Sequence, residues 1–122
     1  MLREMLRAKV HRATVTDRNV EYVGSLTLNA SLMEACDLLP YERVDVYDVH
    51  NGTRFSTYLM PGEPDSGVCC VNGAAARRVE VGDKIIIAAY AALTDEEARR
   101  HRPRVLLVDG KNRPLKEQPP IR

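Results

Sequence analysis

The sequence lacks a charge imbalance, a long apolar run and a targeting segment. Its 18 Lys and Arg nearly balance its 17 Asp and Glu, and the charges are scattered, so we expect neither nucleic acid nor an anionic membrane as a partner. The longest uncharged run, 12 residues from Tyr22 to Met33, is too short to span a bilayer. The first residues form no long apolar stretch with a small-residue cleavage site, so we expect a soluble, cytoplasmic protein.

Cysteine and histidine are also scarce. The three cysteines are an odd number, and Cys69 and Cys70 are neighbours that would point to opposite faces of a strand. Neither a disulfide framework nor a CxxC metal or redox motif is present, and the simplest interpretation makes all three cysteines small buried residues. His11, His50 and His101 lack the HxxH spacing, so we expect no metal site.

The remaining pattern is that of a single, mainly β domain of 122 residues. Period-two alternation and β-branched residues predict strands at residues 8–16, 19–28, 43–49, 54–60, 68–71, 84–91 and 104–109. Asn51-Gly52 predicts a hairpin with a type I′ turn between the third and fourth of these strands. Strands in this number predict a small β-barrel or sandwich.

Two short helices interrupt the strands. A capping box from Ser31 to Glu34 predicts a helix that ends before Pro40, and a second box, Thr94 to Glu97, predicts another that ends by Pro103. We expect the domain to cover residues 1–110 and the proline-rich tail, 111–122, to be frayed.

The Gly24-Ser25 pair is unusual inside a predicted strand. A glycine there often marks a bulge, which is the ordinary interpretation. The alternative is self-attack, in which the Ser25 hydroxyl attacks the carbonyl of Gly24 and gives an ester, because glycine lacks the Cβ that would crowd this approach. Elimination and hydrolysis would then leave a pyruvoyl group.

Several other polar or small residues could build a site. Arg54 could hold a carboxylate and Tyr58 could donate a proton, although a solvated arginine and a half-buried tyrosine are the ordinary alternatives. Asn72-Gly73-Ala74-Ala75 could offer backbone amides to a ligand or form only a tight turn. Lys9, which shares a strand face with His11, is either a surface residue or an anion binder.

Taken together, five motifs resemble a known family. They are KVHRATVT at 9–16, YVGS at 22–25, NGTRFSTY at 51–58, NGAAA at 72–76 and GD at 82–83. In this order and spacing they resemble the bacterial aspartate 1-decarboxylases, pyruvoyl-dependent enzymes that make β-alanine for pantothenate. The resemblance runs from Met1 to about Asp109.

The resemblance implies a double-psi β-barrel, a homotetramer and a proenzyme. The chain would cleave itself between Gly24 and Ser25 into 1–24 and 25–122, with a pyruvoyl group made from Ser25. That group would form a Schiff base with L-aspartate and accept electrons as CO2 leaves, so neither pyridoxal phosphate nor a metal is needed. Some members of the family need an acetyltransferase-like maturation factor, and the sequence does not decide whether this one does.

The resemblance also assigns roles to individual residues. Tyr58 would protonate the substrate after decarboxylation, and Thr57 would serve both self-cleavage and substrate binding. Two cations suit a dianionic substrate, and Lys9 and Arg54 match the positions that bind its carboxylates. Further pocket positions are matched by Asn72, Gly73, Ala74, Ala75, Tyr22 and His11.

The match includes some departures from the family pattern. Tyr47 stands where tryptophan is expected and Arg77 where histidine is common, while the 61–67 loop and Cys69-Cys70 are unusual. None of these removes a proposed catalytic group. Two other interpretations stay open: a pyruvoyl decarboxylase of another acidic amino acid such as glutamate, and a catalytically silent barrel that acts as a binding module.

Overall fold

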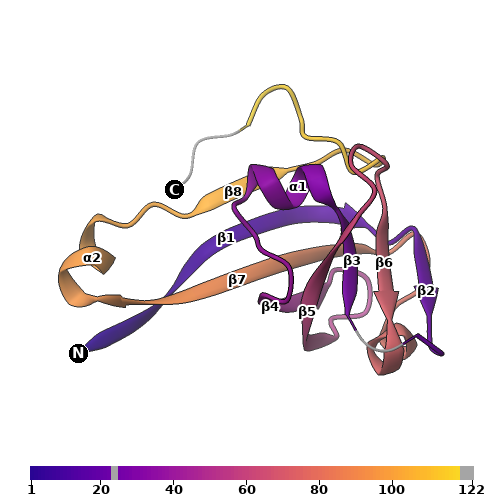
Figure 1. Ribbon diagram of the computed structural model, residues 1–122, viewed down its shortest axis with the longest axis horizontal. Helices are drawn as coiled ribbons and strands as arrows, with labels where there is room; N and C mark the ends of the chain where they lie inside the picture. Colours follow the sequence, from indigo (N-terminus) through magenta and orange to yellow (C-terminus); the bar gives the residue numbers. More distant parts are fainter. Residues whose placement is uncertain (23–24, 119–122) are drawn as a thin grey trace.

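The computed structural model describes residues 1–22 and 25–118, and this part of the chain is mainly β, as predicted (Figure 1). Its strands are β1 (Leu2–Thr14), β2 (Asp17–Asn19), β3 (Leu26–Asn29), β4 (Arg43–Asp48), β5 (Arg54–Gly62), β6 (Cys69–Asn72), β7 (Lys84–Thr94) and β8 (Arg104–Leu107). They pair in the order β2-β6-β3-β5-β4-β7-β1-β8, which fits a double-psi β-barrel. The helices are α1 (Ala30–Ala35), α2 (Asp95–Arg100) and the 3-10 helix η1 (Gly73–Arg78). No helix in the described ranges is long and apolar enough to cross a membrane.

The core is built from the alternate residues of the central strands. Val44 and Val46 of β4 and Ile85 and Ile87 of β7 are each at most 1% exposed. Most of their neighbours in sequence are more exposed, because successive side chains of a strand point to opposite faces. Each such side chain contributes roughly 1.5–3 kcal/mol when it leaves water. The alternation that predicted these strands is therefore also what holds them in place.

Strands β1 and β7 continue past the rest of the sheet as a long antiparallel pair (Figure 1). The sequence predicts the first strand at residues 8–16, yet β1 begins at Leu2, because Leu2 to Leu6 pair with the distal end of β7. The apolar alternation is weak from Leu2 to Leu6, so the sequence of this segment alone does not reveal that it pairs with β7.

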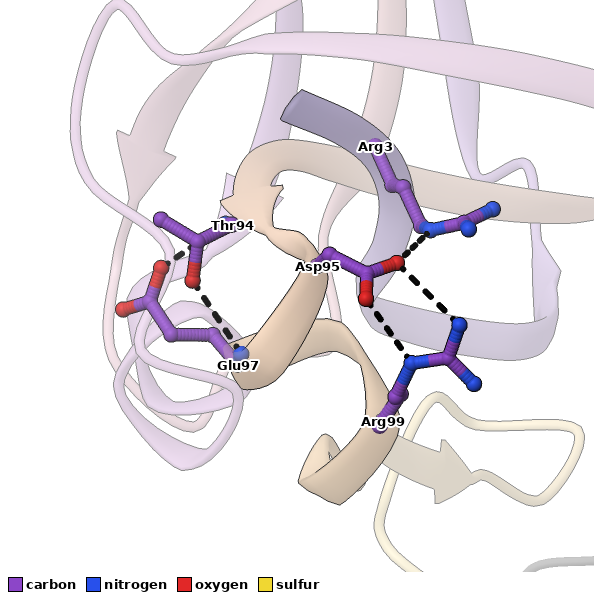
Figure 2. A network of polar contacts seen from close by, with 5 residues as sticks. All are labelled: Arg3, Thr94, Asp95, Glu97 and Arg99. Carbon is purple, nitrogen blue, oxygen red and sulfur yellow. Dashed lines mark hydrogen bonds and ion pairs between the residues drawn. The ribbon is translucent and has the colours of Figure 1, made fainter. Parts of the chain in front are cut away.

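Helix α2 ends this long pair and is tied back to β1 (Figure 2). The predicted capping box is confirmed: the Thr94 hydroxyl accepts from the Glu97 backbone N–H at 3.1 Å, and the Glu97 carboxylate accepts from the Thr94 N–H at 2.9 Å. Asp95 accepts from Arg3 at 2.6 Å and from Arg99 at 2.9 Å. Arg99 and then Arg3 lower the pKa of Asp95.

Two predictions near the start of α1 are wrong. The strand expected at 19–28 is divided between β2 and β3, since Tyr22 N–H donates to Asn19 C=O in a turn. Helix α1 is capped by the side chain of Asn29, two residues before the predicted cap Ser31, and the Ser31 hydroxyl donates to Asp65 instead.

The 51–52 hairpin is present, but not with a type I′ turn. Such a turn needs two consecutive positive φ angles, and of the pair only Gly52 has one, at 72°. The Asp48 carboxylate accepts from the backbone N–H groups of His50 and Asn51, so the loop closes around this buried side chain.

The tail is not frayed over residues 111–118, contrary to expectation. Asn112 is fully buried, and its side chain accepts from the Thr14 N–H at 2.7 Å. It also donates to the carbonyls of Thr14 at 2.9 Å and Gly67 at 2.8 Å. Gln118 bonds both backbone groups of Leu107. These are contacts between residues distant in sequence, which composition does not reveal.

Asn112→Ala is expected to lower the free energy of unfolding by about 2–4 kcal/mol, because three hydrogen bonds are lost and buried backbone groups of Thr14 and Gly67 lose a partner. Urea unfolding of the variant measures this loss. Lys116→Ala, an exposed change in the same tail, is the control and should alter stability by less than about 0.5 kcal/mol. Equal stabilities of the two variants would contradict the anchoring role of Asn112.

Candidate active site

Ser25 lies directly before β3 in an unusual environment. Its side chain is only 1% exposed, and its φ angle is 98°, a left-handed value that serine rarely adopts. A residue held in such a conformation costs roughly 1–3 kcal/mol and persists only where the surrounding structure imposes it. Gly24, the other half of the predicted cleavage pair, lies outside the described residues.

Asn72 of β6 holds Ser25 from one side. Antiparallel pairing sets Leu26 opposite Val71, and the Asn72 N–H donates to the Ser25 carbonyl at 2.9 Å. The Asn72 side-chain amide donates to the Ser25 hydroxyl at 3.3 Å and to the Thr27 hydroxyl at 3.1 Å. Asn72 is itself 4% exposed, so this polar cluster is shielded from water.

Cys70 completes the cluster, and sequence reasoning missed it together with Thr27. The Cys70 thiol donates to the Asn72 side-chain oxygen at 3.2 Å. Cys36 and Cys69 are buried as expected, but Cys70 is only half-buried and polar in its contacts. Burial first, and Asp17 second, raise the pKa of the Cys70 thiol. The sequence signal that could have identified Cys70 is the two-residue period of a strand, which puts residues 70 and 72 on the same face.

Tyr58 of β5 lies on the other side of Ser25. Parallel pairing sets Leu26 of β3 opposite Leu59 of β5. The residues that precede them, Ser25 and Tyr58, are therefore neighbours across the two strands. Tyr58 is half-buried, and its ring stacks against that of Tyr41 with centroids 6.5 Å apart. Thr57, also half-buried, pairs with Val44 of β4.

Arg54 is exposed at the first residue of β5, about 13 Å along the strand from Tyr58. Its guanidinium carbon lies 4.4 Å from the centre of the Tyr47 ring, a cation–π contact. The Tyr47 hydroxyl pairs with that of Tyr90 at 2.8 Å, and this bond, followed by burial, raises the pKa of Tyr47 to about 12. The contacts of Arg54 within the described residues therefore involve Tyr47 and not Ser25.

Lys9 and His11 lie on β1, which is separated from β3 in the sheet order by β5, β4 and β7. Lys9 is opposite Ala88 and Val105, and the Nδ1 atom of His11 is buried without a hydrogen-bond partner among the described residues. Burial, then the charges of Lys9 and Arg12, lower the pKa of His11. These effects favour the neutral form of its ring.

The small residues after Asn72 form the start of η1 rather than a simple turn. Gly73 is buried with a φ of 69°, a value that favours glycine. Ala74 lines an open depression of about 540 Å³, and Ala75 packs against the core. Tyr22 is 57% exposed. The other residues that line the depression are Asn51, Thr53, Arg77 and Arg78.

Hydrogen bonds join Ser25 to Asn72, and the strand register places Tyr58 on β5 next to Ser25; among the described residues no hydrogen bond or ion pair links Lys9 or Arg54 to this group. Within residues 1–22 and 25–118, no three His, Cys, Asp or Glu side chains gather as metal ligands. The cluster offers a buried nucleophile and an amide donor at its oxygen, with a tyrosine in register on the adjacent strand. This set suits acyl transfer within the chain and proton donation to a small ligand.

Comparisons with known proteins agree on one family. A family model described as aspartate decarboxylase matches residues 1–115. An aspartate 1-decarboxylase of Listeria monocytogenes is 53% identical over 112 residues, which cover 92% of this chain and 88% of the relative. Relatives of the same name from Syntrophobacter fumaroxidans and Clostridium botulinum are each 55% identical, over 117 and 108 residues. These alignments cover 96% and 88% of this chain, and 94% and 85% of the two relatives.

Proposed function

The chain belongs to the aspartate decarboxylase family, and from this premise we propose that it converts L-aspartate to β-alanine and CO2 with a pyruvoyl group made from its own Ser25. The observation that carries the proposal is the environment of Ser25: buried, left-handed, with its hydroxyl bonded by Asn72. β-Alanine made here would supply pantothenate synthesis.

Self-cleavage would begin with attack of Ser25 Oγ on the carbonyl carbon of residue 24. The C–N bond between residues 24 and 25 breaks, the amine gains a proton, and residue 24 becomes an ester of Ser25. Loss of the Ser25 α-proton with departure of the carboxylate of residue 24 leaves an enamine, and one water releases ammonia and gives the pyruvoyl group. Asn72 donates to Oγ, and Thr57 on the neighbouring strand is proposed to assist.

The residues of the mature site would bind and protonate the substrate. A pyruvoyl group supplies a carbonyl that bonds the substrate amine and draws electrons from the breaking C–C bond. Tyr58, beside residue 25, donates a proton to the carbon that has lost CO2. Lys9 and Arg54 hold the two carboxylates. The remaining pocket positions are assigned to Asn72, Gly73, Ala74, Ala75, Tyr22 and His11.

The separation of Arg54 from Ser25 in one chain supports a site shared between copies. The Arg54 side chain, at the first residue of β5, lies over the Tyr47 ring of β4. Ser25, in contrast, is buried and is in register with Tyr58 in the middle of β5. We infer that the protein is a homotetramer in which Arg54 of one subunit reaches the Ser25 of its neighbour. The protein is proposed to act in the cytoplasm, with or without a maturation factor.

Mixing two inactive variants tests this shared site. Arg54→Ala and Ser25→Ala are each expected to be inactive alone, while co-expressed mixed tetramers are expected to recover activity at about a quarter of their sites. Recovery is measured as β-alanine formation by tagged, purified mixtures. The control mixes Ser25→Ala with Tyr58→Phe, whose lesions affect neighbouring residues of one chain, and should recover nothing. If mixed tetramers of Arg54→Ala and Ser25→Ala recover no activity, Arg54 and Ser25 of the same subunit form the site.

Intact mass under denaturing conditions tests the function as a whole. Cleavage before Ser25 divides the 13.7 kDa chain into fragments of about 2.7 and about 11 kDa, the larger without a free N-terminal amine. The purified protein is then given L-aspartate or L-glutamate, and the products are identified. A chain that stays whole after warming and incubation with a bacterial extract would contradict the proposal. Cleavage followed by turnover of glutamate alone would reassign the substrate.

A further inference from the structure

The side-chain amide of Asn72 is bonded at both ends. Its nitrogen donates to the hydroxyls of Ser25 and Thr27, and its oxygen accepts from the Cys70 thiol. Cys70 and Asn72 share a face of β6 because they are two residues apart in a strand. No hydrogen bond joins Cys70 to Ser25 in the described part of the chain, so the polar link between the two residues passes through Asn72.

The orientation of this amide matters for the chemistry at Ser25. A rotation by 180° exchanges the oxygen and nitrogen of an asparagine side chain, and hydroxyl groups such as those of Ser25 and Thr27 accept either end as a partner. Only the observed orientation directs an N–H group at the Ser25 oxygen. That donor stabilises the negative charge that grows on Oγ as the hydroxyl loses its proton, whereas an amide oxygen would repel it.

Cys70 is the neighbour that distinguishes the two orientations. A thiol is a weak donor and a weak acceptor, and here its S–H group is directed at the amide oxygen, which favours the oxygen on that side. Burial and Asp17 keep the sulfur protonated at neutral pH, since they raise the thiol pKa. A thiolate would instead attract the amide nitrogen and turn it away from Ser25.

We propose that Cys70 is a positioning residue for self-cleavage, because its S–H group fixes the Asn72 amide with the nitrogen directed at the Ser25 hydroxyl. This inference rests on the proposed self-cleavage at Ser25. It gives a role to a residue whose adjacent partner, Cys69, faces the core and contacts none of this cluster among the described hydrogen bonds.

The rate of cleavage after synthesis tests the proposal. Chains are made in a bacterial cell-free extract, synthesis is stopped, and the 11 kDa fragment is followed with time. Cys70→Ala is expected to cleave roughly 5–10-fold more slowly than the unsubstituted chain, the effect of one lost hydrogen bond. Cys70→Ser restores an O–H donor and is expected to recover most of the rate. Cys69→Ala removes the same atoms from the core-facing neighbour and is the packing control.

A double variant separates positioning from folding. On an Asn72→Ala background, where no amide remains to be oriented, Cys70→Ala is expected to cause no further slowing. An equal rate in Cys70→Ala and the unsubstituted chain would overturn the inference, as would slowing that Cys70→Ser does not relieve or that Cys69→Ala reproduces. If the unsubstituted chain itself fails to cleave, the proposed function is what fails, so the two results are distinguishable.

Discussion

Ser25→Ala is expected to give a single chain of about 13.7 kDa that folds but neither cleaves nor releases CO2 from L-aspartate. The hydroxyl is both the nucleophile and the source of the carbonyl, so no other side chain replaces it. The fold should survive, because the change removes only one buried oxygen. The Asn72 side-chain amide, which donates to that oxygen, keeps its second hydrogen bond, to the Thr27 hydroxyl. Alanine also tolerates the left-handed backbone no worse than serine does.

Intact mass and β-alanine formation measure this result on the purified variant. Ser66→Ala is the matched control, since it removes the same hydroxyl from an exposed loop, where Ser66 bonds only the local backbone. The control should cleave and turn over like the unsubstituted protein. Measurable decarboxylation by uncleaved Ser25→Ala would show that the reaction does not depend on a group made from this serine.

Local sequence signals predicted the elements well where the deciding contacts are themselves local. The alternation of residues 43–49 gave β4, and the Thr94–Glu97 box gave the start of α2. The Ser31 box failed because the helix begins at Ala30 with Asn29 as its N-cap, whose side chain accepts from the Ser31 N–H, and because the Ser31 hydroxyl donates to Asp65. A loop 34 residues away thus decided a local choice.

The predictions for the tail and for the start of β1 failed for the same physical reason. Asn112 is ordered by Thr14 and Gly67, and Leu2 by Thr94, so each depends on a partner distant in sequence. Period and composition describe a segment alone, whereas the free energy of these segments comes from surfaces supplied elsewhere in the chain. The residues with the weakest local pattern were accordingly the ones misjudged.

The sequence proposed members of the candidate site but not their arrangement. Ser25, Tyr58 and Asn72 could be named because their residue types and the family resemblance indicate their chemistry. That β3 lies between β5 and β6, which puts those three residues side by side, follows from strand pairing that no motif encodes. The same topology brought in Thr27 and Cys70, whose residue types suggest no role until their contacts with Asn72 are seen.

Tyr58→Phe is expected to cleave normally and then turn over L-aspartate about 10²- to 10⁴-fold more slowly in kcat, with little change in KM. The phenol is proposed to deliver a proton after CO2 has left, so its loss affects a step that self-cleavage does not share. Phenylalanine keeps the ring that stacks on Tyr41, so packing beside Ser25 is preserved. Intact mass reports cleavage, and steady-state β-alanine formation reports turnover.

Tyr41→Phe provides the comparison that isolates the proton. It removes a phenol from the same stacked pair, but Tyr41 is 74% exposed and does not adjoin Ser25 in the strand register. Its kcat should stay within about twofold of the unsubstituted protein, because the loss of an exposed hydroxyl has little energetic consequence. Equal losses in both variants would indicate that the stack, rather than the Tyr58 proton, supports turnover. Failure of Tyr58→Phe to cleave would move Tyr58 from the decarboxylation step to the maturation of Ser25.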